Sequence, residues 1–109
     1  QQSIALRPAY AEAHNNLGIA YKEQQKLEDA IACYQHAIRL KPNYAEAHHN
    51  LGNALRIQEK LDEAVHYFQQ AVALKPDFFD AYASLCSTLQ QQGKNDEAIA
   101  QYHRLLSLN

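Results

Sequence analysis

Apolar side chains recur along this chain with a helical spacing, in blocks separated by short polar stretches. The first block places four of them on one helix face: Ala13, Leu17, Ala20 and Tyr21. A second block does the same after the polar stretch 24–26: Ala30, Ile31, Tyr34, Ala37 and Ile38. Intervals of three, four, seven and eight residues are typical of an amphipathic helix. The pattern therefore predicts two helices that pack through these faces.

The same pattern returns with a period of 34 residues. Residues 11–44 and 45–78 are identical at half of their positions, and 79–109 form a looser third copy. Prolines keep the same spacing: Pro8, Pro42 and Pro76. Because proline lacks a backbone N–H and clashes with the preceding turn, we expect each to follow the end of a helix. We predict three repeats, preceded in residues 1–8 by the end of another repeat helix.

Small residues occupy equivalent positions in the first two repeats: Gly18, Ala30 and Ala37, then Gly52, Ala64 and Ala71. Larger side chains would overpack a contact between two close helices, so we expect the helices of each pair to meet at these positions. Gln25 and Glu59 stand where Gly93 stands in the third copy. A left-handed backbone at that turn would cost each of them about 1 kcal/mol.

The period and these residues resemble the tetratricopeptide repeat family. The family pattern falls on eight positions of the first repeat: His14, Leu17, Gly18, Tyr21, Ala30, Tyr34, Ala37 and Pro42. Histidine replaces the usual large aromatic residue at His14 and His48. The resemblance implies an all-α fold, a right-handed superhelix of antiparallel helix pairs in which the first helix of each pair lines the concave side.

On that basis the concave side should present the side chains that lie off the packing face of each first helix. We predict a partner-binding groove formed by ten residues: Asn15, Asn16, Ile19, Lys22, His49, Asn50, Asn53, Arg56, Ser84 and Ser87. Asn16 and Asn50 are equivalent, and Ser84 takes their place in the third repeat. Amides carry two donors and two acceptors, which suits pairing with the backbone of an extended peptide. The alternative is that they face water or bond to a neighbouring repeat.

The asparagine row also resembles the repeat region of O-linked N-acetylglucosamine transferases and related bacterial proteins. That narrower likeness implies a substrate-recruiting arm of a glycosyltransferase, with the catalytic domain outside this chain. A carboxylate clamp known in the family would fall on Asn15, Ile19, Asn50, Asp80 and Ser84. Only Asn50 fits that clamp, and Asp80 would repel a carboxylate.

Composition narrows the classes of partner. The net charge is −2, which does not suit a phosphate backbone, so we expect no nucleic acid. No apolar run approaches the length of a membrane span, and no secretion signal is visible, so we expect a cytoplasmic protein, or a nucleocytoplasmic one in a eukaryote. Two cysteines indicate free thiols, Cys86 in the core and Cys33 more exposed.

No pattern indicates catalysis, a metal or a cofactor. The six histidines include no zinc-binding spacing, and we interpret His14 and His48 as packing residues. We expect a non-catalytic module that binds a protein or peptide. A third hypothesis is a scaffold that self-associates through its ends, because the last helix leaves an apolar edge: Leu105, Leu106 and Leu108.

Overall fold

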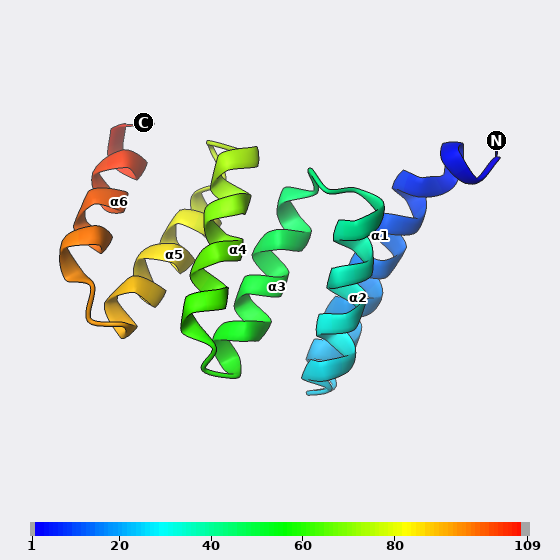
Figure 1. Cartoon of the computed structure of the whole chain (residues 1–109), viewed down its shortest axis with the longest axis horizontal. Helices are drawn as coiled ribbons and strands as arrows, with labels where there is room; N and C mark the ends of the chain where they lie inside the picture. The colour runs from blue at the N-terminus through cyan, green and yellow to red at the C-terminus, as the bar shows by residue number, and fades with distance from the viewer. Residues whose placement is uncertain (1, 108–109) are drawn as a thin grey trace.

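The computed structural model describes the backbone of residues 2–107 and the side chains of residues 10–107. All regular structure in this part of the chain is α-helical, in six helices (Figure 1). They are α1 (Gln2–Glu23), α2 (Leu27–Leu40), α3 (Ala45–Ile57), α4 (Leu61–Leu74), α5 (Phe79–Gln91) and α6 (Asn95–Ser107). The predicted all-α repeat solenoid is confirmed. No helix of the described residues is long and apolar enough to cross a membrane.

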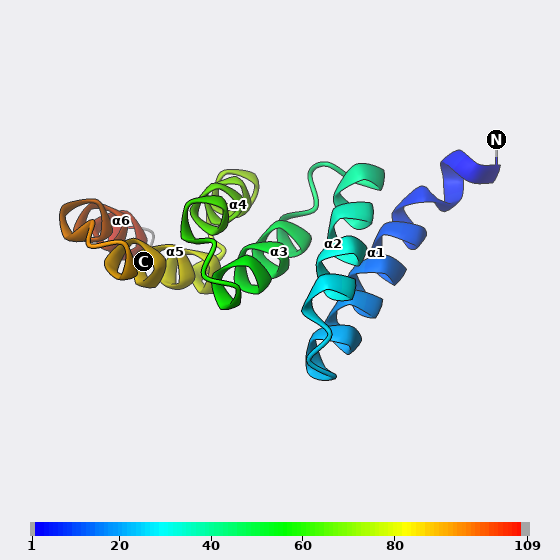
Figure 2. The same ribbon diagram turned by 60° about the horizontal axis from the view of Figure 1, so that its bottom comes forward.

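The helices form two layers, which Figure 2 shows from a second direction. Each odd-numbered helix packs on the even-numbered helix that follows it, and each even-numbered helix packs on the next odd one. Within the described residues α1 contacts α3 and α3 contacts α5, whereas α2, α4 and α6 do not contact one another. The layer of α1, α3 and α5 is therefore the tighter, inner layer, and α2, α4 and α6 form the outer layer.

Glycine lets the two helices of a pair come together, as predicted. A Cβ atom added at Gly18 would lie 2.6 Å from Cε1 of Tyr34, and one at Gly52 would lie 2.7 Å from Cε1 of Phe68. Both rings are fully buried. The equivalent alanines Ala30 and Ala64 are fully buried as well.

The third pair lacks this glycine and packs differently. Cys86 takes the place of Gly52, and its Sγ lies 3.6 Å from the carbonyl oxygen of Ala98. Tyr102, the equivalent of Phe68, is 37% exposed. Two features account for that exposure. The Cys86 side chain stands between α5 and α6, and no helix of the described residues covers α6 on its far side.

The turns within the pairs are left-handed, the case in which a cost was expected at Gln25 and Glu59. The φ angles are 65° at Gln25, 66° at Glu59 and 79° at Gly93. A non-glycine residue in this region of φ costs roughly 1–2 kcal/mol, so the first two turns carry a strain that the third avoids. The helices α2 and α4 end two residues before Pro42 and Pro76, again as predicted.

Pro8 does not behave like the other two prolines. Helix α1 begins at Gln2 and continues through Pro8, so residues 2–8 extend the first repeat helix instead of forming the end of a separate one. A proline in a helix removes one hydrogen bond but keeps a helical φ, and it is best tolerated near the helix start.

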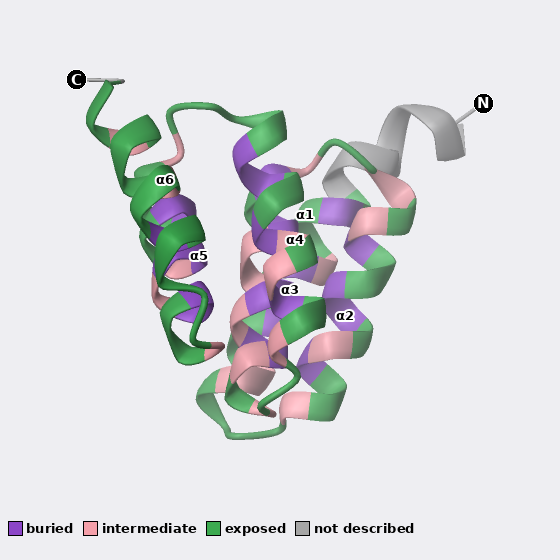
Figure 3. Ribbon diagram, turned by 60° about the vertical axis from the view of Figure 1, so that its left-hand side comes forward, coloured by how far each residue is buried: buried purple, intermediate pink, exposed green. Residues whose placement is uncertain are grey.

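The predicted packing face of α1 is exposed. Leu17 is 45% exposed, while its equivalent Leu51 in α3 is 1% exposed. Figure 3 colours the helices by burial. Ala13 and Ala20 are exposed too, and their equivalents in α3 are fully buried. The helix that precedes each inner helix covers this face, and α1 has no such neighbour in the described residues. What α1 buries is the side toward α2 and α3, at Ala11, Asn15 and Gly18.

Candidate functional site

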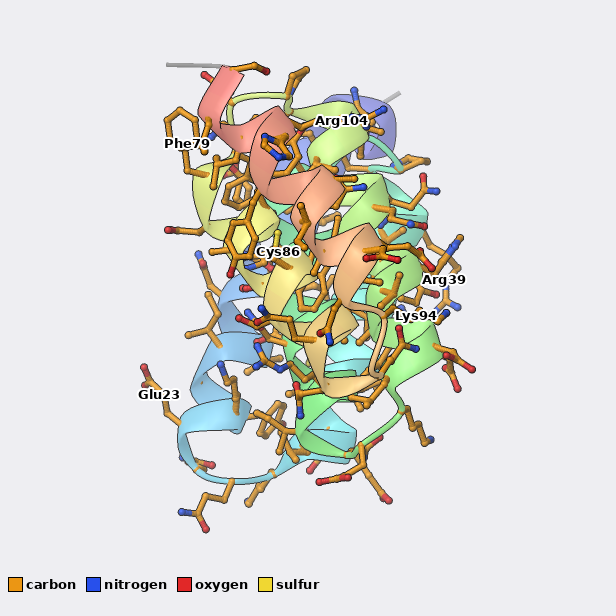
Figure 4. The ribbon with its side chains drawn as sticks, turned by 90° about the vertical axis from the view of Figure 1, so that its left-hand side faces the viewer. Glu23, Arg39, Phe79, Cys86, Lys94 and Arg104 are labelled. Carbon is orange, nitrogen blue, oxygen red and sulfur yellow. The ribbon has the colours of Figure 1, made fainter. Side chains whose placement is uncertain are left out.

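The inner layer carries an open hollow that crosses all three of its helices. Lys22 comes from α1, Gln91 from α5, and the middle of the hollow belongs to α3 and the turn after it: Asn53, Arg56, Ile57 and Glu59. These positions lie at the C-terminal ends of the inner helices. Figure 4 shows the two sides of the molecule: Glu23 and Phe79 lie on the inner side, and Arg39 and Lys94 lie on the outer side.

Polar side chains join neighbouring inner helices at positions 35 residues apart. The Asn50 side-chain amide donates to Oδ1 of Asn15 at 2.9 Å. Arg56 Nε donates to Oε1 of Gln91 at 2.6 Å. Asn15 is only 5% exposed, so it lies beneath the surface of the inner layer and has almost no accessible atoms for a partner to contact. Among the predicted groove residues, Asn15 is thus placed between α1 and α3, where it orients Asn50.

His49 connects α3 to α5 in the middle of the inner layer. Its Nε2 lies 3.2 Å from Oγ of Ser84 and 3.3 Å from Nδ2 of Asn53. The ring of Phe78 packs edge-on against the imidazole at 5.0 Å between centroids. Two donors directed at Nε2 fit a neutral ring with its proton on Nδ1.

Burial sets the charge state of this histidine. It lowers the pKa of the His49 imidazole below the ordinary value of 6.5, and Lys22 acts in the same direction. Asp80 and Glu46 act in the opposite direction but do not outweigh burial. His49 is therefore neutral near pH 7 and serves the inner layer as a hydrogen-bonding group.

Charge is distributed unevenly across the inner layer. Exposed carboxylates stand in the first turns of α3 and α5, at Glu46 and Asp80, and Glu12 takes the equivalent repeat position in the middle of α1. Cations stand near the ends of α1 and α3: Lys22 and Arg56. Lys75 Nζ lies 3.5 Å from Glu46 Oε2, both about half exposed, so this ion pair contributes at most ~1 kcal/mol. A partner lying across the layer meets an acidic edge and a basic edge.

The other predicted groove residues remain accessible. Asn16 and Ile19 are exposed on α1, and Asn53, Ser84 and Ser87 are half-buried. Asn50 and Ser84 each bond to the preceding inner helix, so the row of equivalent side chains that begins at Asn16 is partly engaged within the protein. The role of these residues in holding a partner stays a prediction.

Sequence reasoning missed two contributors to the inner layer. Ile57 is exposed at the edge of the hollow, and Phe78 supports His49 from the loop before α5. The helical period did not assign either residue to the inner layer. Both lie at helix boundaries, where the period no longer determines which way a side chain points. An isoleucine followed by a polar turn was the available signal for the first.

The histidines at the repeat equivalents have packing roles. His48 Nε2 donates to the carbonyl oxygen of Pro42 at 2.9 Å, and the ring stacks on Tyr67 at 5.9 Å. His14 stacks on His36 at 5.1 Å. Across residues 10–107 no three histidine, cysteine or acidic side chains converge into a metal site.

The two cysteines are both buried free thiols. Cys86 lies in the core as predicted, at 0% exposed, and Cys33 is the more exposed of the two at 8%, although it is buried as well. Burial and the nearby Asp29 raise the pKa of the Cys33 thiol. A raised pKa leaves little thiolate, so this position does not favour redox chemistry.

The apolar edge that was predicted for self-association at the last helix is only partly exposed. Leu105 is half-buried against the core, and Leu106 is 66% exposed. Leu108 lies outside the described residues.

Comparison with known proteins identifies the repeats. Two profiles described as "Tetratricopeptide repeat" match residues 1–32 and 45–78, and one described as "TPR repeat" matches residues 20–56. Among curated proteins no significant match is found. Nothing in these comparisons points to catalytic activity or to a glycosyltransferase.

Solved structures of similar shape include peptide-bound examples. A crystal structure of MamA is 31% identical with a TM-score of 0.86, over 89% of this chain and 57% of that one. The first TPR of Spaghetti (RPAP3), bound to the HSP90 peptide SRMEEVD, is 26% identical with a TM-score of 0.86, over 94% of this chain and 83% of that one. The second TPR of Spaghetti, with the same peptide, covers both chains fully at a TM-score of 0.90 and, at 24% identity, shares the fold. This chain spans little more than half of the MamA chain.

Proposed function

Since this chain belongs to the tetratricopeptide repeat family, we propose that it is a protein-interaction module that holds an extended segment of a partner protein across its inner layer. The observation that carries the proposal is the hollow that crosses α1, α3 and α5. A segment lying there contacts three helices at once, and those helices are already fixed by their own hydrogen bonds. Little ordering of the module is then needed on binding.

The basic edge of the hollow defines the chemistry of the segment. Lys22 and Arg56 favour a carboxylate on the partner, and exposed Ile57 beside them favours an apolar side chain. In the Spaghetti structures a related fold holds an acidic peptide, which supports this class of ligand. The family's carboxylate clamp is not the source of recognition here, because Asp80 stands in one of its positions.

A peptide selection tests the proposal. Random peptides displayed on phage are selected against the chain, and the binders are titrated into isotope-labelled protein followed by NMR. We expect the largest shift changes at the C-terminal ends of the inner helices. The charge reversal Lys22→Glu with Arg56→Glu should weaken binding tenfold or more, as expected for two lost charge-assisted contacts.

A matched variant separates position from net charge. Arg39→Glu with Lys94→Glu changes the net charge equally on the outer side and should leave the affinity unchanged (Figure 4). Equal loss in both variants, or shift changes confined to the outer layer, would refute a site in the hollow. The glycosyltransferase parent and the cytoplasmic location stay predictions.

A further inference from the structure

A second hollow adjoins the first at the turn between α1 and α2. Four residues line its volume of about 460 Å³: Lys22, Gln25, Leu27 and Ile57. Lys22 and Ile57 also line the hollow of the inner layer, so the two are continuous at this edge of the molecule. This edge pocket lies between the first two repeats, because Ile57 ends α3 and the other three residues belong to α1, α2 or the turn that joins them.

Ile57 gives the edge pocket an apolar wall that the other repeats do not have. It is 54% exposed, and the equivalent residues are Glu23 in the first repeat and Gln91 in the third. Because the same helix end carries a polar residue twice, packing of the repeat does not require an isoleucine there. The facing apolar residue, Leu27, is half-buried against the core.

Gln25 reaches the edge pocket from a strained turn. Its φ is 65°, a region that favours glycine. Gly93 stands at the equivalent position of the third repeat with a φ of 79°, and a Cβ added there would meet no atom within 4 Å. Glycine therefore suits this turn without strain. The two residues that carry the strain each line a hollow, Gln25 the edge pocket and Glu59 the hollow of the inner layer. Strain of this kind is typically kept at binding sites.

Charge and polarity define the group that fits the edge pocket. A side chain that enters between Leu27 and Ile57 has to be apolar, because a polar group there would lose its water without gaining a partner. Lys22 is the charged residue of the four, and it favours a carboxylate beside that apolar group. The exposed amide of Gln25 carries both donors and acceptors, which suits a peptide backbone.

We propose that the edge pocket binds an aliphatic side chain of the partner segment, next to an acidic residue that pairs with Lys22, and that Gln25 bonds to the backbone of the segment there. The inference rests on the proposed function, since it assigns one part of the segment that the inner layer holds. It specifies the partner chemistry as an acidic residue beside a leucine, isoleucine or valine.

Two isoleucine variants test the apolar wall. The probe is the tightest-binding peptide from the phage selection, and isothermal titration calorimetry measures its affinity. Ile57→Gln should weaken binding about tenfold, because the peptide side chain loses its apolar contact. The melting temperature should stay that of the wild type, since glutamine is the native residue at the equivalent position 91. Ile99→Gln, at an isoleucine of nearly equal exposure on α6, should leave the affinity unchanged.

Two glycine variants test the strained turn. Gln25→Gly should raise the melting temperature by a few degrees, because it relieves the strain, and should weaken peptide binding by roughly twofold to tenfold, because one hydrogen bond is lost. Glu59→Gly relieves the same strain outside the edge pocket. It should raise the melting temperature similarly without weakening an acidic peptide.

The outcomes distinguish this inference from the proposed function. If the selection yields no peptide, or the peptide shifts resonances only in the outer layer, the proposed function is refuted and the edge pocket with it. If a peptide binds in the hollow and Ile57→Gln keeps the wild-type affinity, the edge pocket alone is refuted. An equal loss of affinity in Ile99→Gln, or full affinity in a stabilised Gln25→Gly, also overturns the inference.

Discussion

Helices α1 and α3 carry almost the same sequence and have almost opposite surfaces. AEAHNNLG in the first and AEAHHNLG in the second differ at one position. Yet Leu17 is largely exposed and Leu51 is buried. The difference lies in what stands beside each helix, because α2 covers α3 and no described helix covers α1. In a repeat protein the neighbour decides what a residue contributes to stability.

Truncating the two leucines gives the strongest test of this comparison. Leu51→Ala should lower the free energy of unfolding by ~2–5 kcal/mol, because it leaves a cavity in the core. Leu17→Ala should lower it by about 0.5 kcal/mol or less, as expected of an exposed position. Urea unfolding measures both changes in the free energy of unfolding. Equal losses would mean that α1 is covered in solution.

The glycine positions test a contact that should be the same in α1 and α3. Gly18 and Gly52 both face a buried ring of their own repeat, so Gly→Ala at either should overpack the contact. Overpacking costs ~1–3 kcal/mol, against a gain of about 1 kcal/mol in helix propensity. We expect a net loss of roughly 1 kcal/mol at both sites by thermal unfolding.

Shrinking the ring provides the control for the glycine variants. In a Phe68→Leu background, Gly52→Ala should become neutral or stabilising, because the clashing ring atoms are gone. A loss of the same size in both backgrounds would place the clash elsewhere.

The buried rings of the two repeats differ by one hydroxyl. Tyr34 is fully buried, its Oη has no hydrogen-bond partner among the described residues, and burial raises its pKa to about 12. Phe68 fills the same position in the second repeat. Tyr34→Phe should therefore raise the free energy of unfolding by about 1 kcal/mol, and Phe68→Tyr should lower it by a similar amount. Denaturant midpoints measure both, and a loss in Tyr34→Phe would reveal a partner for the hydroxyl.

The smallest expected effect concerns His49, which the second repeat has in place of Asn15. Because the pKa of His49 is lower in the folded chain than its ordinary 6.5, the unfolded chain binds the extra proton first. Its contribution to stability is complete above pH 6.5 and is lost as the pH falls through the folded-state pKa. His49→Asn should flatten the melting temperature over this acid range. A profile that stays as steep in His49→Asn as in the wild type would contradict this role of His49.

The sequence carried most of the information on contacts within a repeat. The close approach of two helices at Gly18 and the end of α2 before Pro42 were both predicted, because each depends on residues of one repeat. The left-handed φ at Gln25 was considered as a condition, and the structure meets it. The family and the all-α solenoid followed from the period itself.

Features that depend on a neighbour could not be predicted in the same way. A face on a helical wheel does not say whether another helix stands against it, so Leu17 was placed in the core. The burial of Asn15 depends on how α1 and α3 cross, which sets the contact with Asn50 at 35 residues instead of 34. Helix α1 continues through Pro8 because a proline alone does not determine where a helix ends.

The gaps between the outer helices have a mechanical meaning. Since α2, α4 and α6 do not contact one another within the described residues, widening or narrowing their spacing breaks no contact between them. The inner helices do touch, so they act as the hinge line about which the stack bends. Each outer helix also packs on the next inner helix, so a change in curvature has to slide α2 on α3 and α4 on α5. We expect such sliding to open or close the inner layer around a segment that lies across it.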